Sequence, residues 1–268
     1  MVTRTCMDNE IISYNEMCRR ESSSLQQGMH FDLSGRGYSI LLMSVRRNSP
    51  YEDRLDNDGS TIIYEGHDAP RSALVPDPKV VDQPLVFNGG APTQNGRFLR
   101  AALANKRGEA PPCPVRVYEK IKDGIWSYNG LFSLVDAWPE GQRNRTVFKF
   151  KLVAVESESI HTTGRQDRIE RRRVIPTAVK LEVWKRDGGR CVLCKATDEL
   201  HFDHDLPFSK GGTSLKADNV QLLCARHNLS KSDRILLSRL QPFPPPAPNG
   251  KIPPERSERT CLPLPVAT

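Results

Sequence analysis

Two pairs of metal-binding side chains in the C-terminal half of the chain constrain its fold more than any other feature. Cys191 and Cys194 are separated by two residues, and so are Cys224 and His227. A spacer of this length lets both side chains of a pair reach one ion, and three thiolates with one imidazole form a common tetrahedral zinc set. Because four protein ligands close the coordination shell, we expect a structural Zn²⁺ that supplies much of the folding free energy of a small module.

Size and hydropathy narrow the class of protein. The 268 residues are 37% hydrophobic and 26% charged, enough for two modest globular domains. No run of about eighteen apolar residues is present, so we expect no transmembrane helix and no membrane partner. Asp8 and Glu10 interrupt the N-terminal apolar residues, which argues against a secretory signal and favours a cytoplasmic location. The cysteines outside the two pairs stand alone, as in a reducing compartment.

Positive charge indicates a polyanionic partner. The net charge is +7, and five arginines lie within residues 165–173, just before the zinc module. Such a run is typical either of a nucleic-acid contact or of a solvated linker.

Composition divides the chain into five segments. Between residues 29 and 156, short β-branched or aromatic runs alternate with turn signals such as residues 122–124 and 138–141, and one helix is expected near residues 95–106. This pattern predicts a twisted sheet or open barrel with packed helices. The segments are an N-terminal segment (1–28), this strand-rich domain (29–156), a basic linker (157–174), the zinc module (175–240) and a Pro-rich tail expected to lack a packed core (241–268).

Polar residues that zinc does not require lie between and beside its ligands. Asp203 and His204 end a short predicted strand at residues 199–203, and Asn228 begins a predicted helix. A carboxylate and an amide oxygen suit Mg²⁺ or Mn²⁺ and leave coordination positions for water and phosphate. A histidine beside such a cation can deprotonate water, as phosphodiester hydrolysis requires.

In this order, these residues resemble the HNH nuclease motif of the ββα-metal class over about residues 175–235. The motif residues are Cys191, Cys194, Asp203, His204, Pro207, Gly211, Gly212, Asn219, Cys224, His227, Asn228 and Lys231. The resemblance implies that His204 is the general base and that Asp203 and Asn228 bind the catalytic cation. It also implies that Asn219 holds the loop that carries the base.

Two histidines keep alternative roles. Many relatives have a cysteine where this chain has His227, so His227 is either the fourth zinc ligand, which we favour, or a residue at the catalytic cation. His201 is either a phosphate contact or, as we favour, an exposed strand histidine.

Residues 29–156 resemble SRA (YDG) domains, which flip a modified cytosine out of duplex DNA. The resemblance rests on five segments that occur in the order found in these domains: residues 39–44, 51–53, 58–59, 63–66 and 82–83. It implies that Tyr51 and Tyr64 stack on the flipped base and that Asp53, or alternatively Asp56, accepts a hydrogen bond from its N4 amine. Glu65 joins this pocket, in a Tyr-Glu-Gly sequence where relatives commonly have Tyr-Thr-Gly. The alternative is that these tyrosines are ordinary strand aromatics and Asp53 a turn residue.

Together the two resemblances imply an α+β protein, in which an SRA-like twisted β-barrel or sheet with packed helices precedes a small zinc-stabilised ββα-metal (HNH) domain. The implied activity is that of an HNH-type, type IV (modification-dependent) restriction endonuclease. Its partner would be double-stranded DNA containing 5-methylcytosine or 5-hydroxymethylcytosine, and its ions structural Zn²⁺ and catalytic Mg²⁺ or Mn²⁺. Cutting both strands with one such site requires a homodimer or two binding events.

Two other classes of function compete with this interpretation. One is a non-catalytic reader of modified DNA in which the zinc module is only structural. The other is a zinc nucleobase deaminase, but the chain has no His-x-Glu paired with Pro-Cys-x-x-Cys.

Overall fold

The computed structural model describes residues 8–46, 48–56, 59–155, 174–206 and 212–231. The arginine-rich run at 165–173 and the Pro-rich tail therefore lie outside the described residues. The chain divides into a unit Met1–Ile235 and a unit Leu236–Thr268, and every described residue belongs to the first. No helix in these described ranges is long and apolar enough to cross a membrane.

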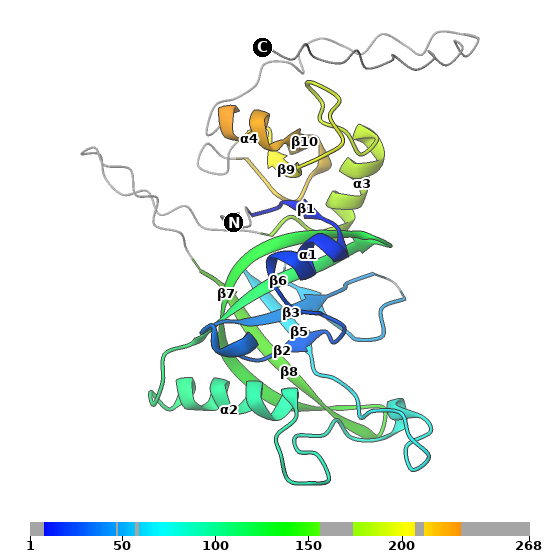
Figure 1. Cartoon of the computed structure of the whole chain (residues 1–268), viewed down its shortest axis with the longest axis vertical. Coiled ribbons are helices and arrows are strands. Elements are labelled where there is room, and N and C mark those ends of the chain that lie inside the picture. Colours follow the sequence, from blue (N-terminus) through cyan, green and yellow to red (C-terminus); the bar gives the residue numbers. More distant parts are fainter. Residues whose placement is uncertain (1–7, 47, 57–58, 156–173, 207–211, 232–268) are drawn as a thin grey trace, which may run out of the picture. The chain divides into compact units, whose positions relative to one another are not determined.

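One mixed sheet dominates the N-terminal part of the described chain, which is a mixed α/β fold with few helices (Figure 1). Its path runs β2-β3-β6-β7-β8-β5-β4, with β1 pairing on β7, and of these pairs only β3 and β6 are parallel. The strands are β1 (Ile11–Ile12), β2 (Met29–His30), β3 (Ser39–Met43), β4 (Arg54–Leu55), β5 (Thr61–Glu65), β6 (Cys113–Lys122), β7 (Ile125–Gln142) and β8 (Arg145–Ala154).

The length of β7 differs from the prediction. The expected turn at residues 138–141 does not form, and the chain reverses instead at Arg143 and Asn144, which have φ of 48° and 64°. Pairing between β6 and β7 ends at Leu134, so the following part of β7 has no β6 neighbour. Pro139, which lacks an N–H donor, is therefore tolerated there while it pairs with Phe148 of β8.

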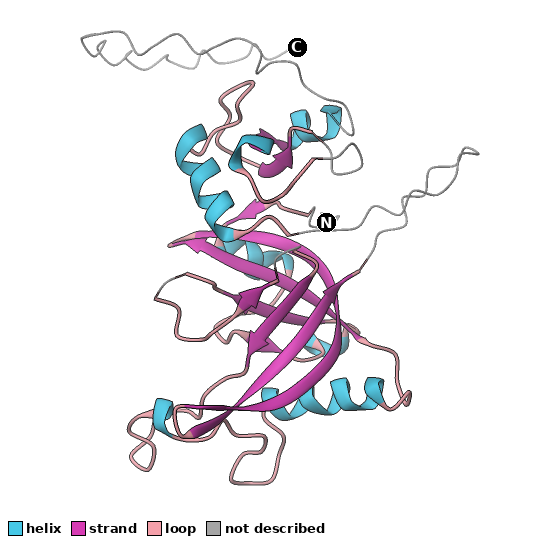
Figure 2. Ribbon diagram, turned by 180° about the vertical axis from the view of Figure 1, so that it is seen from behind, coloured by secondary structure: helices cyan, strands magenta, loops and turns pink. Residues whose placement is uncertain are grey.

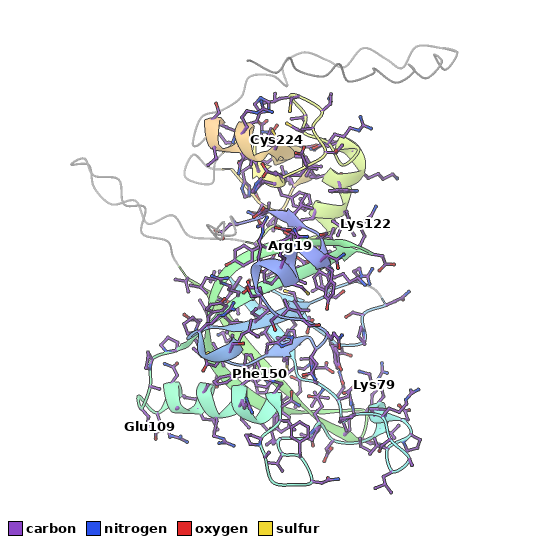
Figure 3. The ribbon with its side chains drawn as sticks, in the orientation of Figure 1. Arg19, Lys79, Glu109, Lys122, Phe150 and Cys224 are labelled. Atoms are coloured by element: carbon purple, nitrogen blue, oxygen red, sulfur yellow. The ribbon has the colours of Figure 1, made fainter. Side chains whose placement is uncertain are left out.

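Two apolar clusters cover the sheet. In the larger, which includes Phe150 (Figure 3), α2 (Gln94–Lys106) packs against β7 and β8. The ring centroids of Phe98 on α2 and Phe150 on β8 are 5.8 Å apart. The Thr93 hydroxyl caps this helix by accepting a hydrogen bond from the N–H of Gly96. The second cluster includes Met17 of α1 (Tyr14–Arg20). The N-terminal segment therefore packs a helix on the sheet and adds strand β1 to it.

The zinc module has the order helix, strand, strand, helix (Figure 2). Its elements are α3 (Thr177–Asp187), β9 (Leu200–His204), β10 (Val220–Cys224) and α4 (Ala225–Lys231), with β9 and β10 antiparallel. Gly188 follows α3 with φ of 65°, the left-handed conformation that commonly ends a helix. Three short 3₁₀ helices complete the described elements: Leu33–Gly35, Pro78–Val80 and Ala217–Asn219.

Candidate functional site

The four predicted zinc ligands come together. The ligand atoms of Cys191, Cys194, Cys224 and His227 all lie within 4.8 Å of one another. Cys224 ends β10 (Figure 3), and His227 is on α4, so the turn from strand to helix brings the second pair beside the first. The group could therefore hold one metal ion.

The distances within this cluster fit zinc. The sulfur atoms of Cys194 and Cys224 are 3.7 Å apart, and Nδ1 of His227 lies 3.4 Å from the sulfur atoms of both Cys191 and Cys224. Bond lengths of about 2.3 Å to sulfur and 2.05 Å to nitrogen at tetrahedral angles require separations of about 3.8 Å and 3.6 Å. Although burial opposes ionisation, backbone N–H groups lower the pKa of the Cys191 thiol to about 6, which favours the thiolate that binds metal.

A carboxylate and a buried ammonium meet where α4, the helix that carries His227, packs on β9. Asp203 on β9 pairs with Lys231 on α4 at 2.8 Å, and the side-chain amide of Gln221 lies 3.4 Å from the same carboxylate oxygen. Burial raises the pKa of Asp203, while Lys231 opposes that change. The carboxylate is thus held at the junction of β9, β10 and α4.

His204 is the next residue along β9. Its Nε2 lies 2.9 Å from the hydroxyl of Ser214, and the second ring nitrogen, Nδ1, takes no part in that contact. Burial, and then the charge of Lys231, lower the pKa of His204 to about 4. The imidazole is therefore neutral at physiological pH and able to accept a proton.

Asn219 connects both ends of the loop that follows His204. Its Oδ1 accepts a hydrogen bond from the N–H of Leu206, and its Nδ2 donates to the carbonyls of Leu206 and Thr213. The carbonyl of Asn219 accepts from Asp205. One side chain thus fixes the described ends of the loop from Leu206 to Thr213.

Asn228 and His201 complete the predicted set. Asn228 is on α4, three residues before Lys231, so both residues lie on one side of the helix that packs against β9. His201 is fully buried on β9, so its expected exposure is wrong. The chain around Glu10 covers it, because Glu10 and His201 form a β-bridge.

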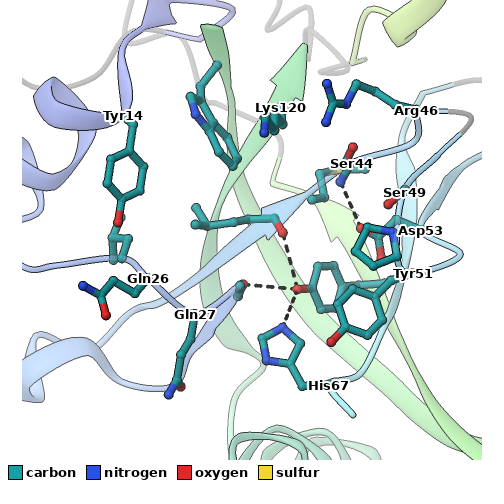
Figure 4. A pocket seen from close by; sticks show the side chains of 17 residues that line it. Tyr14, Gln26, Gln27, Ser44, Arg46, Ser49, Tyr51, Asp53, His67 and Lys120 are labelled. Atoms are coloured by element: carbon teal, nitrogen blue, oxygen red, sulfur yellow. Dashed lines mark hydrogen bonds between the residues drawn. The ribbon is translucent and has the colours of Figure 1, made fainter. Parts of the chain in front are cut away.

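A separate pocket of about 720 Å³ lies at the ends of β3 and β5 (Figure 4). Among its lining residues are the expected Tyr51, Asp53 and Tyr64. Gly28, Leu42, Ser44 and His67 also line it. Aromatic faces and one carboxylate therefore meet in one cavity.

Asp53 is the acid of this pocket. Its two carboxylate oxygens accept hydrogen bonds of 3.0 Å from the backbone N–H groups of Ser44 and Glu65. Burial raises the pKa of Asp53 to about 7, although both backbone donors and Lys149 oppose the shift. Asp56, the alternative acid, caps a turn instead, because it accepts a hydrogen bond from the N–H of Thr61.

The two predicted tyrosines differ in exposure. Tyr51 is half-buried, and the ammonium of Lys79 lies 4.3 Å from its ring centroid. Tyr64 is only 1% exposed, and its hydroxyl contacts the carbonyls of Gly28 and Leu42 at 3.2 and 3.4 Å. Tyr64 thus forms a fixed wall of the pocket, and Tyr51 presents the more accessible ring.

Glu65 is not among the residues that line the pocket. Its carboxylate instead forms a buried ion pair with Lys149 at 2.8 Å and lies 3.6 Å from Arg145. Alternation along β5 explains the difference, since neighbouring strand residues point to opposite faces and Tyr64 takes the pocket side.

Sequence reasoning missed His67. Its Nε2 lies 3.2 Å from the Tyr64 hydroxyl, and its ring stacks on Tyr51 with centroids 5.4 Å apart. Asn95 on α2 fixes its backbone, accepting from the N–H of His67 and donating to its carbonyl at 2.9 and 2.8 Å. The one available signal was its position three residues after Tyr64.

No protein-family model matches the chain, and no curated protein matches it. Among solved structures, it is similar to the SRA domain of SUVH5 bound to hemimethylated CG DNA, with 23% identity, TM-score 0.40, and 61% of this chain and 93% of that chain covered. It is also similar to KRYPTONITE in complex with mCHG DNA, with 21% identity, TM-score 0.39, and 59% and 34% covered. A third is the DNA modification-dependent restriction endonuclease AspBHI, with 15% identity, TM-score 0.36, and 65% and 73% covered. Similarities at this level assign no function.

Proposed function

We propose that this protein is a modification-dependent DNA endonuclease of the HNH type. Its pocket would bind a flipped 5-methylcytosine or 5-hydroxymethylcytosine, and its Asp203-His204 centre would hydrolyse phosphodiester bonds nearby. One observation carries the proposal: the same chain holds an aromatic pocket with a buried carboxylate and, in the module that carries the Cys3His cluster, a neutral histidine adjacent to a second carboxylate.

The pocket has the groups that a flipped cytosine requires. An extruded base loses its stacking partners, and Tyr51 offers a replacement ring. An ionised carboxylate has about four acceptor positions, of which Asp53 uses two for the backbone donors of Ser44 and Glu65. The remaining positions suit the N4 amine of cytosine. Asp53 is thus pre-oriented by backbone rather than by a movable side chain.

The second centre has the groups that phosphodiester hydrolysis requires. His204 is neutral and is held through Nε2 by Ser214, so Nδ1 is the nitrogen that would take a proton from the attacking water. Asp203 and Asn228 supply a carboxylate and an amide oxygen from elements packed together, a donor set that fits Mg²⁺ or Mn²⁺. Such a cation, when bound, would stabilise negative charge on the phosphate.

The two parts of the chain would have separate roles. Residues 29–156, with the N-terminal strand and helix packed on them, would select the base, and residues 175–240 would cut. The net charge of +7 favours DNA as the partner. Zn²⁺ at the Cys3His cluster would be structural, and cutting of both strands would use a homodimer or two binding events.

The proposal is tested with a plasmid carrying 5-methylcytosine, incubated with the protein and Mn²⁺. The unaltered protein should cut the plasmid. A His204→Ala variant should bind the same DNA with unchanged affinity and leave it intact. An intact plasmid with the unaltered protein would favour the non-catalytic reader, and normal cutting by His204→Ala would show that His204 is not the base.

A further inference from the structure

His67 lines the pocket and contacts both of its tyrosines. The backbone clamp by Asn95 fixes its position, and its ring lies between Tyr64 and Tyr51. Gly28 packs against it so closely that a Cβ there would come within 2.7 Å of Nε2. The imidazole is therefore held in one place within a pocket proposed to receive a base (Figure 4).

The hydrogen bonds around Tyr64 define which nitrogen of His67 carries the proton. The Tyr64 hydroxyl lies near two carbonyl oxygens, those of Gly28 and Leu42, and near Nε2 of His67. A phenol has one proton, and carbonyl oxygens only accept. The hydroxyl must therefore donate to a carbonyl and accept from Nε2–H, which leaves Nδ1 with an in-plane lone pair.

The charge state of His67 agrees with this assignment. Burial lowers the pKa of His67 to about 4. The charge of Asp68 opposes this shift, and the charges of His30 and Lys79 add to it. The ring is neutral at physiological pH and carries one N–H, so with that proton on Nε2 the acceptor is Nδ1.

The stacking geometry places the imidazole beside the space that a bound base would occupy over Tyr51. The planes of His67 and Tyr51 are 17° apart with centroids separated by 5.4 Å. The Lys79 ammonium lies 4.3 Å from the Tyr51 ring centroid. At a stacking separation of roughly 3.5 Å, the imidazole is displaced sideways by roughly 4 Å, so the imidazole itself covers only part of the Tyr51 face. A pyrimidine stacked there would lie in the same layer as the imidazole and meet it edge to edge.

We propose that His67 is a specificity-determining residue, whose Nδ1 accepts a hydrogen bond from the hydroxyl of 5-hydroxymethylcytosine. The inference rests on the proposed function, because it takes base recognition in this pocket as given. A cytosine that donates N4 to Asp53 carries its 5-substituent on the adjacent ring atom, next to the same edge. A 5-methyl group there would desolvate Nδ1 without offering it a donor.

The consequence is a preference between two modified bases. A buried acceptor left without a partner weakens binding by about tenfold or more. The pocket should therefore bind 5-hydroxymethylcytosine about tenfold more tightly than 5-methylcytosine. 5-Formylcytosine, which has an acceptor oxygen in the same place, should bind no better than 5-methylcytosine.

Two substitutions distinguish the roles of the two ring nitrogens of His67. Glutamine can reproduce the Nε2 donor to Tyr64 but has no acceptor where Nδ1 lies, whereas asparagine can place Oδ1 near Nδ1 and loses the Tyr64 contact. His67→Gln should abolish the preference for 5-hydroxymethylcytosine, and His67→Asn should retain most of it. Ser44→Ala is the matched control, since the Ser44 hydroxyl also belongs to the pocket lining and is buried without a hydrogen bond to any described residue.

The experiment measures affinity by fluorescence anisotropy, using the full-length protein without added Mg²⁺ or Mn²⁺. The duplexes are identical except for one cytosine, 5-methylcytosine, 5-hydroxymethylcytosine or 5-formylcytosine. Preference for 5-hydroxymethylcytosine that disappears in His67→Gln supports the inference. Equal affinity for the methyl and hydroxymethyl duplexes overturns it, and so does a preference lost in Ser44→Ala but kept in His67→Gln. The four-duplex comparison with unaltered protein decides the matter even if a variant fails to fold.

The same data separate this inference from the proposed function. If both modified duplexes bind better than unmodified DNA but equally well, only the role of His67 fails. If unmodified cytosine binds as tightly as every modified base, base recognition itself fails.

Discussion

The ammonium of Lys231 lies 2.8 Å from the carboxylate of Asp203 and also donates a hydrogen bond to the carbonyl of His204. The Lys231 side chain is 1% exposed and that of Asp203 15%. This buried pair fastens α4, which carries His227 and Asn228, to the strand that carries the proposed base.

Replacement of Lys231 by methionine should destabilise the protein by about 3 kcal/mol, because it leaves a buried carboxylate without its partner. Added Mn²⁺ should recover part of that loss, since a cation at Asp203 would replace the ammonium. Urea unfolding with and without Mn²⁺ measures both effects. Lys185→Met, at an exposed position on α3, is the control. Unchanged stability of Lys231→Met would contradict the importance of this pair.

Loss of a zinc ligand should unfold the zinc module and leave the base pocket intact. Cys224→Ser should lower bound zinc from about one ion per chain, because a serine hydroxyl is a poor zinc ligand. Limited proteolysis should then cleave the module, while binding to modified DNA persists. The control is Cys113→Ser, at a cysteine outside the cluster, which should bind as much zinc as the unaltered protein. Full zinc content in Cys224→Ser would refute the ligand assignment.

Binding of modified DNA should strengthen as pH rises through about 7. Burial raises the pKa of Asp53 to about 7, and only its ionised form has the full set of acceptors for N4. The effect of pH on folding stability has the opposite sign. A carboxyl group whose pKa is higher in the folded than in the unfolded protein stabilises the fold at low pH, so the contribution of Asp53 is lost as the pH rises toward 7. Anisotropy between pH 6 and 8, with unmodified DNA as the reference, measures the effect on binding. A preference for modified DNA that does not vary with pH would contradict it.

A second buried ion pair should show strong coupling between its members. Lys180 on α3 bonds Glu119 on β6 and the side-chain carbonyl of Asn129 on β7, both at 2.7 Å. Lys180→Met should cost about 3 to 5 kcal/mol by leaving Glu119 buried and unpaired. Adding Glu119→Gln to that variant should restore much of the stability, and a double-mutant cycle of urea unfolding measures this. Simple additivity would rule out a direct interaction.

Sequence patterns predicted the parts of this protein that depend on local chemistry. The four candidate zinc ligands were predicted from short fixed spacings, and their side chains do gather. The turn before β7 follows from Gly124, whose φ of 77° favours glycine. The helix at residues 95–106 follows from apolar spacing and is present as α2.

Features that depend on distant partners were not predictable in the same way. The turn signal at residues 138–141 was overridden because β8 pairs with that stretch. Glu65 was expected in the pocket, but Lys149, far along the chain, binds it on the other face of the sheet. His67 is held by Asn95, far along the chain, and only its position three residues after Tyr64 marks it locally.

The most direct test of the central claim is digestion of three DNAs of identical sequence, which contain cytosine, 5-methylcytosine or 5-hydroxymethylcytosine, in the presence of Mg²⁺ or Mn²⁺. We predict cutting of the modified DNAs near the modified base and no cutting of the unmodified DNA. Equal cutting of all three would contradict recognition of the modified base, and cutting of none would contradict the nuclease assignment.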